Sequence, residues 1–319
     1  MATPEWIKYG ERATADNDPI YGASGIVNRP GKDAWTNFLV GHDADGNHTF
    51  FSAVPAPGRL TLTSATPVTT ADVTAATTVY YTPHKGNLIA LYSGTAWELS
   101  TLAEKSLSLS GWTADKNNDI FLYDNAGTLT LERAEWTNDT TRATALVLQD
   151  GIYVKSGATT RRYLGTIRTT STTGQTEDSI SKRFIWNYDN RVSRLLSYSE
   201  ITASWTYNSQ TWQQLRGQTT AGVFLIAGLI EQTLNAHFQI RTANGFIGIG
   251  FNSTIAPASI GDPTHNGYGA NISIHLCTLP ILGFNAVYPL QRAPTGLTAT
   301  LTGVYDSQQV MYFTAEVLA

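Results

Sequence analysis

Residues 59–192 consist of short apolar or alternating segments separated by turn-forming residues. Asp150-Gly151, between the apolar segments 145–148 and 152–154, is the strongest hairpin signal in the chain. No helical segment long enough to connect parallel strands lies between these segments. The pattern therefore excludes a parallel α/β sheet and predicts an antiparallel barrel or sandwich. Two further hairpins are predicted around the turns 93–95 and 124–127, each flanked by strand-like segments: 89–92, 96–99, 119–123 and 128–132.

Residues 193–319 have longer alternating segments. Apolar residues recur at every second position from Leu234 to Ile240, and again in 297–301. The final segment, 309–317, is apolar on both faces, which predicts one face in the domain core and the other against a neighbouring subunit. The overall prediction is an all-β protein with a jelly-roll-like sandwich in 193–319, an antiparallel barrel or sandwich in 56–192, and an N-terminal arm in 1–55.

The arm is interrupted by proline, glycine and Asn-Asp clusters too often for a long helix or a sheet. A short helix is predicted over 32–40, with Trp35, Phe38 and Leu39 on one face. A single short helix cannot bury these side chains by itself. We therefore expect the three residues to dock on another chain.

Composition excludes several classes of protein. Of 319 residues, 14% are charged, against about 25% in an average soluble protein. The net charge is −4 with no basic run, which argues against a nucleic-acid partner. No apolar run approaches the roughly 18 residues of a membrane span, and no secretory signal is visible at the N-terminus. The one cysteine, Cys277, lies in an apolar run and is predicted to be a buried structural thiol.

Two parts of the amino-acid sequence resemble proteins of tailed-phage virions. From Arg59 to Val192, whole phrases closely resemble a β-rich module of tail-fibre-like and head-fibre-like chains. In the arm, the phrase over 28–50 resembles the "NR..KDL" and "H..DG.H" phrases near the N-termini of phage fibre proteins. This resemblance implies a protein of the virion, assembled in the host cytoplasm and fastened to other virion proteins by its N-terminal part. It also implies a homotrimer, although no coiled-coil heptad is visible.

His42 and His48 flank an Asp-Gly-Asn segment in the arm. Three interpretations fit: a plain turn, a metal held by both imidazoles on a threefold axis, or a calcium loop. Calcium is the weakest, because position twelve counted from Asp43 is Val54, where an EF-hand needs a glutamate. No other cofactor is expected.

Phe184, Trp186 and Tyr188 occupy every second position and so share one face of a predicted strand, with Arg183, Ile185 and Asn187 on the other. Three aromatic rings in a row can stack on sugars, form a subunit interface or fill a core. The sequence leaves all three roles open.

Catalytic motifs are absent from the sequence. No nucleophile elbow, phosphate-binding loop, His-Glu-x-x-His or paired-cysteine zinc spacing occurs, and Gly245, Gly248 and Gly250 are predicted to mark bulges or close backbone approach. The favoured prediction is a non-enzymatic, trimeric fibre or spike that can bind host-surface polysaccharide. The alternatives are a capsid or tail decoration protein without a receptor role and a glycan depolymerase. A depolymerase would need two carboxylates in one cleft. Five residues could supply such a pair: Glu98, Asp119, Asp124, Glu132 and Glu135.

Overall fold

The computed structural model describes residues 40–42, 48–50, 55–262 and 269–319. The chain forms two compact units, Met1–Pro55 and Ala56–Ala319. In the first unit, the described residues form one antiparallel hairpin, β1 (Val40–His42) with β2 (His48–Phe50). The predicted helix over 32–40 lies outside the described residues except for Val40, which begins β1.

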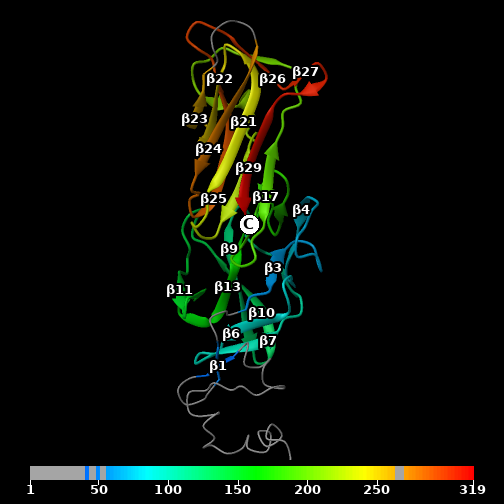
Figure 1. The fold of residues 1–319 in the computed structure, drawn as a ribbon, viewed down its shortest axis with the longest axis vertical. Coiled ribbons are helices and arrows are strands. Elements are labelled where there is room, and N and C mark those ends of the chain that lie inside the picture. The colour runs from blue at the N-terminus through cyan, green and yellow to red at the C-terminus, as the bar shows by residue number, and fades with distance from the viewer. Residues whose placement is uncertain (1–39, 43–47, 51–54, 263–268) are drawn as a thin grey trace, which may run out of the picture. The chain divides into compact units, whose positions relative to one another are not determined.

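The predicted all-β class is confirmed: the described residues form strands and a single 3-10 turn, η1 (Leu215–Gly217) (Figure 1). All three predicted hairpins are present. In the hairpin of β11 (Leu146–Gln149) and β12 (Ile152–Lys155), Asp150 and Gly151 have φ values of 51° and 82°, as a type I′ turn requires.

Residues 56–192, called the β module below, contain three sheets of their own. A six-stranded sheet has the order β10-β9-β13-β12-β11, with β16 also paired to β13. A three-stranded sheet has the order β3-β5-β8, and β6 pairs with β7. The strands are β3 (Gly58–Thr61), β5 (Thr78–Pro83), β6 (Leu88–Tyr92), β7 (Trp97–Thr101), β8 (Lys105–Ser108), β9 (Asn117–Asn125), β10 (Thr128–Glu135), β11 (Leu146–Gln149), β12 (Ile152–Lys155), β13 (Ala158–Arg168) and β16 (Ile185–Asn187).

Residues 193–319, called the C-terminal sandwich below, contribute a six-stranded sheet of order β17-β29-β21-β26-β18, with β24 paired to β21. They also contribute most of an eight-stranded sheet of order β23-β22-β25-β20-β15-β14-β4, with β19 paired to β25. The small β27–β28 hairpin completes the set. The strands are β4 (Val73–Ala76), β14 (Thr176–Asp178), β15 (Lys182–Arg183), β17 (Ser193–Tyr198), β18 (Trp205–Tyr207), β19 (Gln213–Gln214), β20 (Val223–Ala227), β21 (Leu234–Ala243), β22 (Phe246–Phe251), β23 (Pro257–Gly261), β24 (Ala270–Thr278), β25 (Gly283–Arg292), β26 (Ala299–Thr302), β27 (Val304–Tyr305), β28 (Gln308–Gln309) and β29 (Tyr312–Leu318).

Each half of the second unit has its own apolar core. One core draws its buried residues from Leu60 to Ile185, and the other from Leu196 to Ala319. Leu234, Ala236, Phe238 and Ile240 all belong to the second core, as their alternation predicts. The two cores therefore divide close to residue 192.

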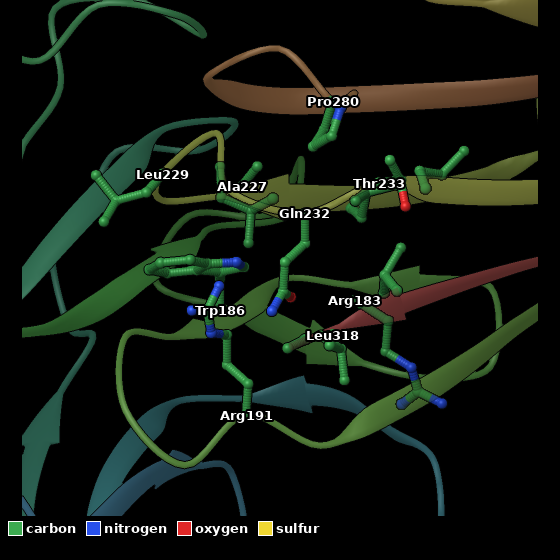
Figure 2. A pocket seen from close by; sticks show the side chains of 14 residues that line it. Arg183, Trp186, Arg191, Ala227, Leu229, Gln232, Thr233, Pro280 and Leu318 are labelled. Atoms are coloured by element: carbon green, nitrogen blue, oxygen red, sulfur yellow. The ribbon is translucent and has the colours of Figure 1, made fainter. Parts of the chain in front are cut away.

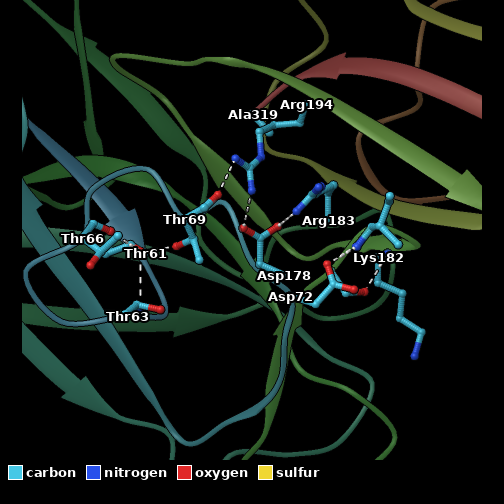
Figure 3. Close-up of polar contacts among 12 residues, drawn as sticks. Thr61, Thr63, Thr66, Thr69, Asp72, Asp178, Lys182, Arg183, Arg194 and Ala319 are labelled. Atoms are coloured by element: carbon cyan, nitrogen blue, oxygen red, sulfur yellow. Dashed lines mark hydrogen bonds and ion pairs between the residues drawn. The ribbon is translucent and has the colours of Figure 1, made fainter.

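Hydrogen bonds and ion pairs join the two halves. The eight-stranded sheet crosses the division through β15 and β20, which pair in parallel, an exception to the antiparallel pattern that the sequence predicts. Figure 3 shows Asp178 between two arginines: its carboxylate lies 3.0 Å from Arg183 Nη1 and 3.2 Å from Arg194 Nη2. Arg194 also donates to the carbonyl of Thr69 at 2.8 Å. Charge-assisted hydrogen bonds of this kind fix the relative orientation of the groups that they join.

Cys277 corrects one prediction, because it is exposed rather than buried. In β24, Ile274 is buried and Ile272 and Leu276 pack against the sandwich core. The residues between them point outward, so Cys277 lies on the solvent side of the strand. The apolar run misled the prediction because only every second residue of it faces the core.

Candidate functional site

Aromatic side chains cover the outer surface of the eight-stranded sheet. On β25, Val287 belongs to the sandwich core. Because strand residues alternate between the two faces, the even-numbered residues of β25 face away from that core. The register places partners from β20 and β22 on the same side. We call this surface the aromatic face and define it by five half-buried residues: Trp212, Phe224, Phe246, Phe284 and Tyr288.

Glycines form the floor beneath the rings. Trp212 immediately precedes β19, and its ring reaches β22 on the far side of β25. A Cβ added at Gly248 would lie 3.0 Å from Trp212 Cζ3 and 2.8 Å from Pro257 Cβ. At Gly250 it would lie 2.9 Å from Leu290 Cδ1, and the β22–β23 register shifts at the same position. The prediction that these glycines mark bulges or close approach is confirmed.

Arg292 lies between two of the rings. Its guanidinium carbon is 4.3 Å from the ring centroid of Phe246 and 5.2 Å from that of Trp212, both within the range of cation–π attraction. Its Nε is buried and has no hydrogen-bond partner. No carboxylate of the described residues pairs with it, although the side chain as a whole is half-buried. The cation is thus held in place by rings alone.

The other end of the aromatic face is packed more tightly. Phe224 stacks parallel to Phe284 with ring centroids 6.3 Å apart, and Tyr288 meets Phe224 edge-on at 5.8 Å. Arg168 lies over Phe284 at 4.1 Å, but this arginine also pairs with Asp139 at 2.7 Å. Burial raises the pKa of the Tyr288 phenol.

Uncharged polar residues surround the Arg292 end. The loop before β19 runs alongside the segment after β25, because Ala293 N–H donates to the Ser209 carbonyl at 2.9 Å. The Thr295 hydroxyl donates to Gln210 Oε1 at 3.2 Å, and both side chains are exposed. Hydroxyl and amide groups of this kind can donate to and accept from a polar ligand beside the rings.

Two cavities of the described part of the chain are too small for an organic ligand. Figure 2 shows one that holds about 20 Å³, lined by Trp186, Gln232 and Arg191 among others. Arg191 lies over the Trp186 ring at 5.0 Å and pairs with Glu231 at 2.7 Å. A second cavity, beside Asp178, holds about 10 Å³. Each admits about one water molecule and excludes a sugar ring.

Of the three aromatics predicted on one face, Phe184 and Trp186 are buried, and Tyr188 is half-buried beside them. Phe184 is 6% exposed and Trp186 is 4% exposed. Trp186 stacks on Tyr163 at 6.4 Å, and Tyr188 tilts against the same ring at 5.7 Å. Because Phe184 and Trp186 are buried inside the subunit, their rings cannot contact a glycan or a neighbouring subunit. Of the three roles that the sequence left open, these two residues fill a core.

The predicted sites in the arm are only partly described. The register of β1 and β2 places His42 directly opposite His48, and residues 43–47 between them lie outside the described residues. Trp35, Phe38 and Leu39 also lie outside them. Within the described ranges no group of three or more metal-ligating side chains is close enough to hold a metal ion.

Three of the five candidate carboxylates, Asp119, Glu132 and Asp124, have well-defined structural partners. Asp119 is 1% exposed, and its carboxylate accepts from Arg142 Nε at 2.6 Å and from the Thr166 hydroxyl at 2.7 Å. Glu132 pairs with both Lys155 and Arg161. Asp124 accepts from the Gly127 N–H in its own turn at 2.6 Å. These three carboxylates make contacts within the β module. The aromatic face lies in the C-terminal sandwich, so these carboxylates are not part of it.

Sequence reasoning missed the aromatic face. Its residues come from four strands or their flanks, separated by up to 76 positions, and strand pairing alone brings them together. The one local signal was the alternation of Gly248 and Gly250 within β22, which marks a surface where neighbouring side chains cross the backbone.

Comparison with protein-family models gives no match, and no curated protein matches. Among solved structures, the chain is similar to the insecticidal δ-endotoxin Cry8Ea1 of Bacillus thuringiensis, with 7% identity, a TM-score of 0.26 and coverage of 78% of this chain and 52% of that one. It is also similar to a mutant of β-glucuronidase 2 from Bacteroides uniformis, with 8% identity, a TM-score of 0.19 and coverage of 72% and 27%. An exo-β-1,3-galactanase from Phanerochaete chrysosporium has 12% identity, a TM-score of 0.15 and coverage of 86% and 72%.

The chain spans about half the length of the endotoxins that it matches. Likenesses with TM-scores this low assign neither a family nor a function. None of the helices in the described part of the chain is long and apolar enough to cross a membrane.

Proposed function

We propose that this protein is a homotrimeric structural component of a tailed-phage virion that contacts host-surface glycans through its C-terminal sandwich. The virion assignment depends on the resemblance of 59–192, and of the phrase in the arm, to phage fibre and head-fibre proteins. The all-β architecture is compatible with that assignment. Residues 1–55 are proposed to fasten the protein to the particle, through Trp35, Phe38 and Leu39.

The observation that carries the glycan-contact proposal is the aromatic face. It combines half-buried rings, an arginine without an acidic partner and a neutral polar rim on an open sheet surface. The apolar face of a sugar stacks on aromatic rings while its hydroxyls bond to polar neighbours. The proposed activity is therefore binding rather than turnover.

The trimer is supported by apolar side chains that a lone subunit leaves in solvent. Ile201 is 79% exposed, Ile255 is 73% exposed and Leu148 is 60% exposed. Leu195 and Leu318 are also exposed, on the strands β17 and β29 that pair with each other. Burial of such residues against identical neighbours would stabilise an oligomer.

Three measurements test the proposal. The mass of the purified protein in solution should be three times that of the 34.6 kDa chain. Cryo-electron microscopy of intact particles should locate the protein in multiples of three copies. Host cells should retain the wild-type protein and release the Trp212→Ala variant. A decoration protein would be found on the particle yet would not bind cells, and a depolymerase would release reducing sugars from host polysaccharide; either result would overturn the proposal.

A further inference from the structure

The charge balance of the C-terminal sandwich makes Arg292 unusual. Residues 193–319 contain four arginines and no lysine. Two of the arginines have carboxylate partners: Arg194 pairs with Asp178 at 3.2 Å, and Arg216 pairs with Glu200 at 3.2 Å. Arg241 and Arg292 have none among the described residues, and of the four only Arg292 has a buried Nε without a hydrogen bond. A buried donor without a partner destabilises the fold unless something else accepts from it.

We infer that Arg292, Trp212 and Phe246 form a subsite for a carboxylate-bearing sugar, such as a uronic acid unit of an acidic polysaccharide. The inference rests on the proposed glycan-binding function and specifies the kind of glycan. A carboxylate is the group that a guanidinium binds with paired hydrogen bonds, through two N–H donors of its planar fork. It would accept from the terminal Nη groups of Arg292, because Nε itself is enclosed by the protein.

The flanking rings hold the guanidinium ready for such a ligand. Phe246 and Trp212 hold it through attraction to its charge, at 4.3 Å and 5.2 Å from its central carbon. A cation held by rings keeps its N–H donors available, whereas a cation held by a carboxylate has used them. Because the side chain is already ordered, binding costs less conformational entropy.

The surroundings favour a sugar over an acidic peptide. Trp212 packs over the Gly248 backbone and remains half-buried, so part of its ring is available for the C–H face of a pyranose. The rim supplies uncharged groups from Gln210, Thr211 and Thr295, which suit hydroxyls. A site for an acidic peptide would be expected to carry several cations, and this rim carries one.

Calorimetric titration of the full-length protein provides the test, with tetragalacturonic acid as the probe. Two matched probes separate the contributions: its methyl ester, which has the same rings without charge, and tetraglutamate, which has the charge without sugar rings. Wild-type protein should bind tetragalacturonic acid at least about tenfold more tightly than either matched probe, because a charge-assisted hydrogen-bond pair is lost with the ester and the ring stacking is lost with the peptide.

Variants place that binding at the subsite. Arg292→Met and Trp212→Ala should each weaken tetragalacturonate binding by about tenfold or more, and Arg292→Lys should fall between Arg292→Met and wild type. The control is Arg161→Met, because Arg161 also lies over a ring, that of Tyr123 at 4.1 Å, but pairs with Glu132 at 3.2 Å. It should leave binding unchanged. Circular dichroism checks that each variant is folded, and if Arg292→Met is not, Arg292→Lys and the ester comparison decide.

Three results would overturn the inference. Equal binding of the acid and its ester would leave a glycan-binding face without an acidic subsite. Equal binding of tetraglutamate would mean a site for charge alone. Binding of no oligosaccharide would also overturn the inference, and the cell-retention assay then decides separately whether the proposed function fails with it.

Discussion

The two halves of the second unit use their ring-stacked cations differently. In the β module, each cation that lies over an aromatic ring also pairs with a carboxylate, as Arg142 does with Asp119 and Arg161 does with Glu132. In the C-terminal sandwich, Arg241 lies over Tyr305 and Arg292 over Phe246, and neither pairs with a carboxylate of the described residues. The first arrangement satisfies the cation within the fold, while the second leaves it available to a ligand. The comparison supports a stabilising role for the cations of the β module, and it is the basis on which we propose recognition as the role of the C-terminal sandwich.

Arg142→Met should be the most destabilising change, because it leaves the buried Asp119 carboxylate without its cation. The substitution also removes the hydrogen bond from Arg142 Nη2 to the Gly228 carbonyl, 2.6 Å long, which joins the two halves. We expect a loss of about 3–5 kcal/mol in the free energy of unfolding, measured by denaturant titration.

The matched control for that change is Arg161→Met, which should cost less than about 1 kcal/mol, because the Arg161–Glu132 pair is partly exposed and Glu132 keeps Lys155. Similar costs for the two variants would contradict the idea that the buried pair is the structural one.

Gly248→Ala tests the floor of the aromatic face. The added methyl group would meet Pro257 and the Trp212 ring, so the ring must move or the strand must bend. We expect a loss of about 1–3 kcal/mol and a change in tryptophan fluorescence. Ala258→Ser, at an exposed position of the neighbouring β23, should change neither. An unchanged fluorescence spectrum in Gly248→Ala would mean that Trp212 does not depend on this glycine.

Arg292→Met should change stability by no more than about 1 kcal/mol, even though it should weaken acidic-sugar binding by about tenfold or more. Methionine keeps an apolar chain between the two rings, and no carboxylate is left unpaired. Thermal unfolding monitored by circular dichroism measures the effect. A loss as large as that of Arg142→Met would show that Arg292 serves the fold, and the contrast between the halves would fail.

The smallest expected effect concerns pH. His237 and His275 stack on the outside of the sandwich with ring centroids 4.5 Å apart. Burial, and then the nearby His275, lower the pKa of His237 below its ordinary 6.5. The folded state therefore binds a proton less readily than the unfolded state. The contribution to stability is complete above pH 6.5 and is lost as the pH falls through the lowered pKa. A small decrease in melting temperature between pH 7.5 and 5 should follow.

His275→Asn should reduce that pH dependence, because it removes the neighbouring charge. A melting temperature that rises on acidification in the wild type would contradict the sign of the effect.

Local turn chemistry made the hairpins predictable. Asp150-Gly151 specifies its own turn through two residues that tolerate positive φ, so no distant contact is needed to identify it. The alternation within β21 was equally direct, since every second residue from Leu234 faces one core. Both predictions used only neighbours in the chain.

Elements that depend on long-range contacts could not be predicted from the sequence. The central strand β13 was not predicted, because its buried positions include Arg162 and Arg168 among apolar residues. Their partners, the Ala90 carbonyl and Asn117, lie 72 and 51 positions away. Arg292 was overlooked for the same reason, because the rings beside it belong to strands that only the sheet register brings together.

Hydrogen–deuterium exchange of the full-length protein, with and without tetragalacturonic acid, tests the division between the halves most directly. The account predicts ligand-induced protection of the backbone amides in 209–213, 246–250 and 290–296, with the amides of 56–192 unchanged. Protection confined to 56–192, or no protection in these three segments at ligand concentrations that saturate binding, would contradict it.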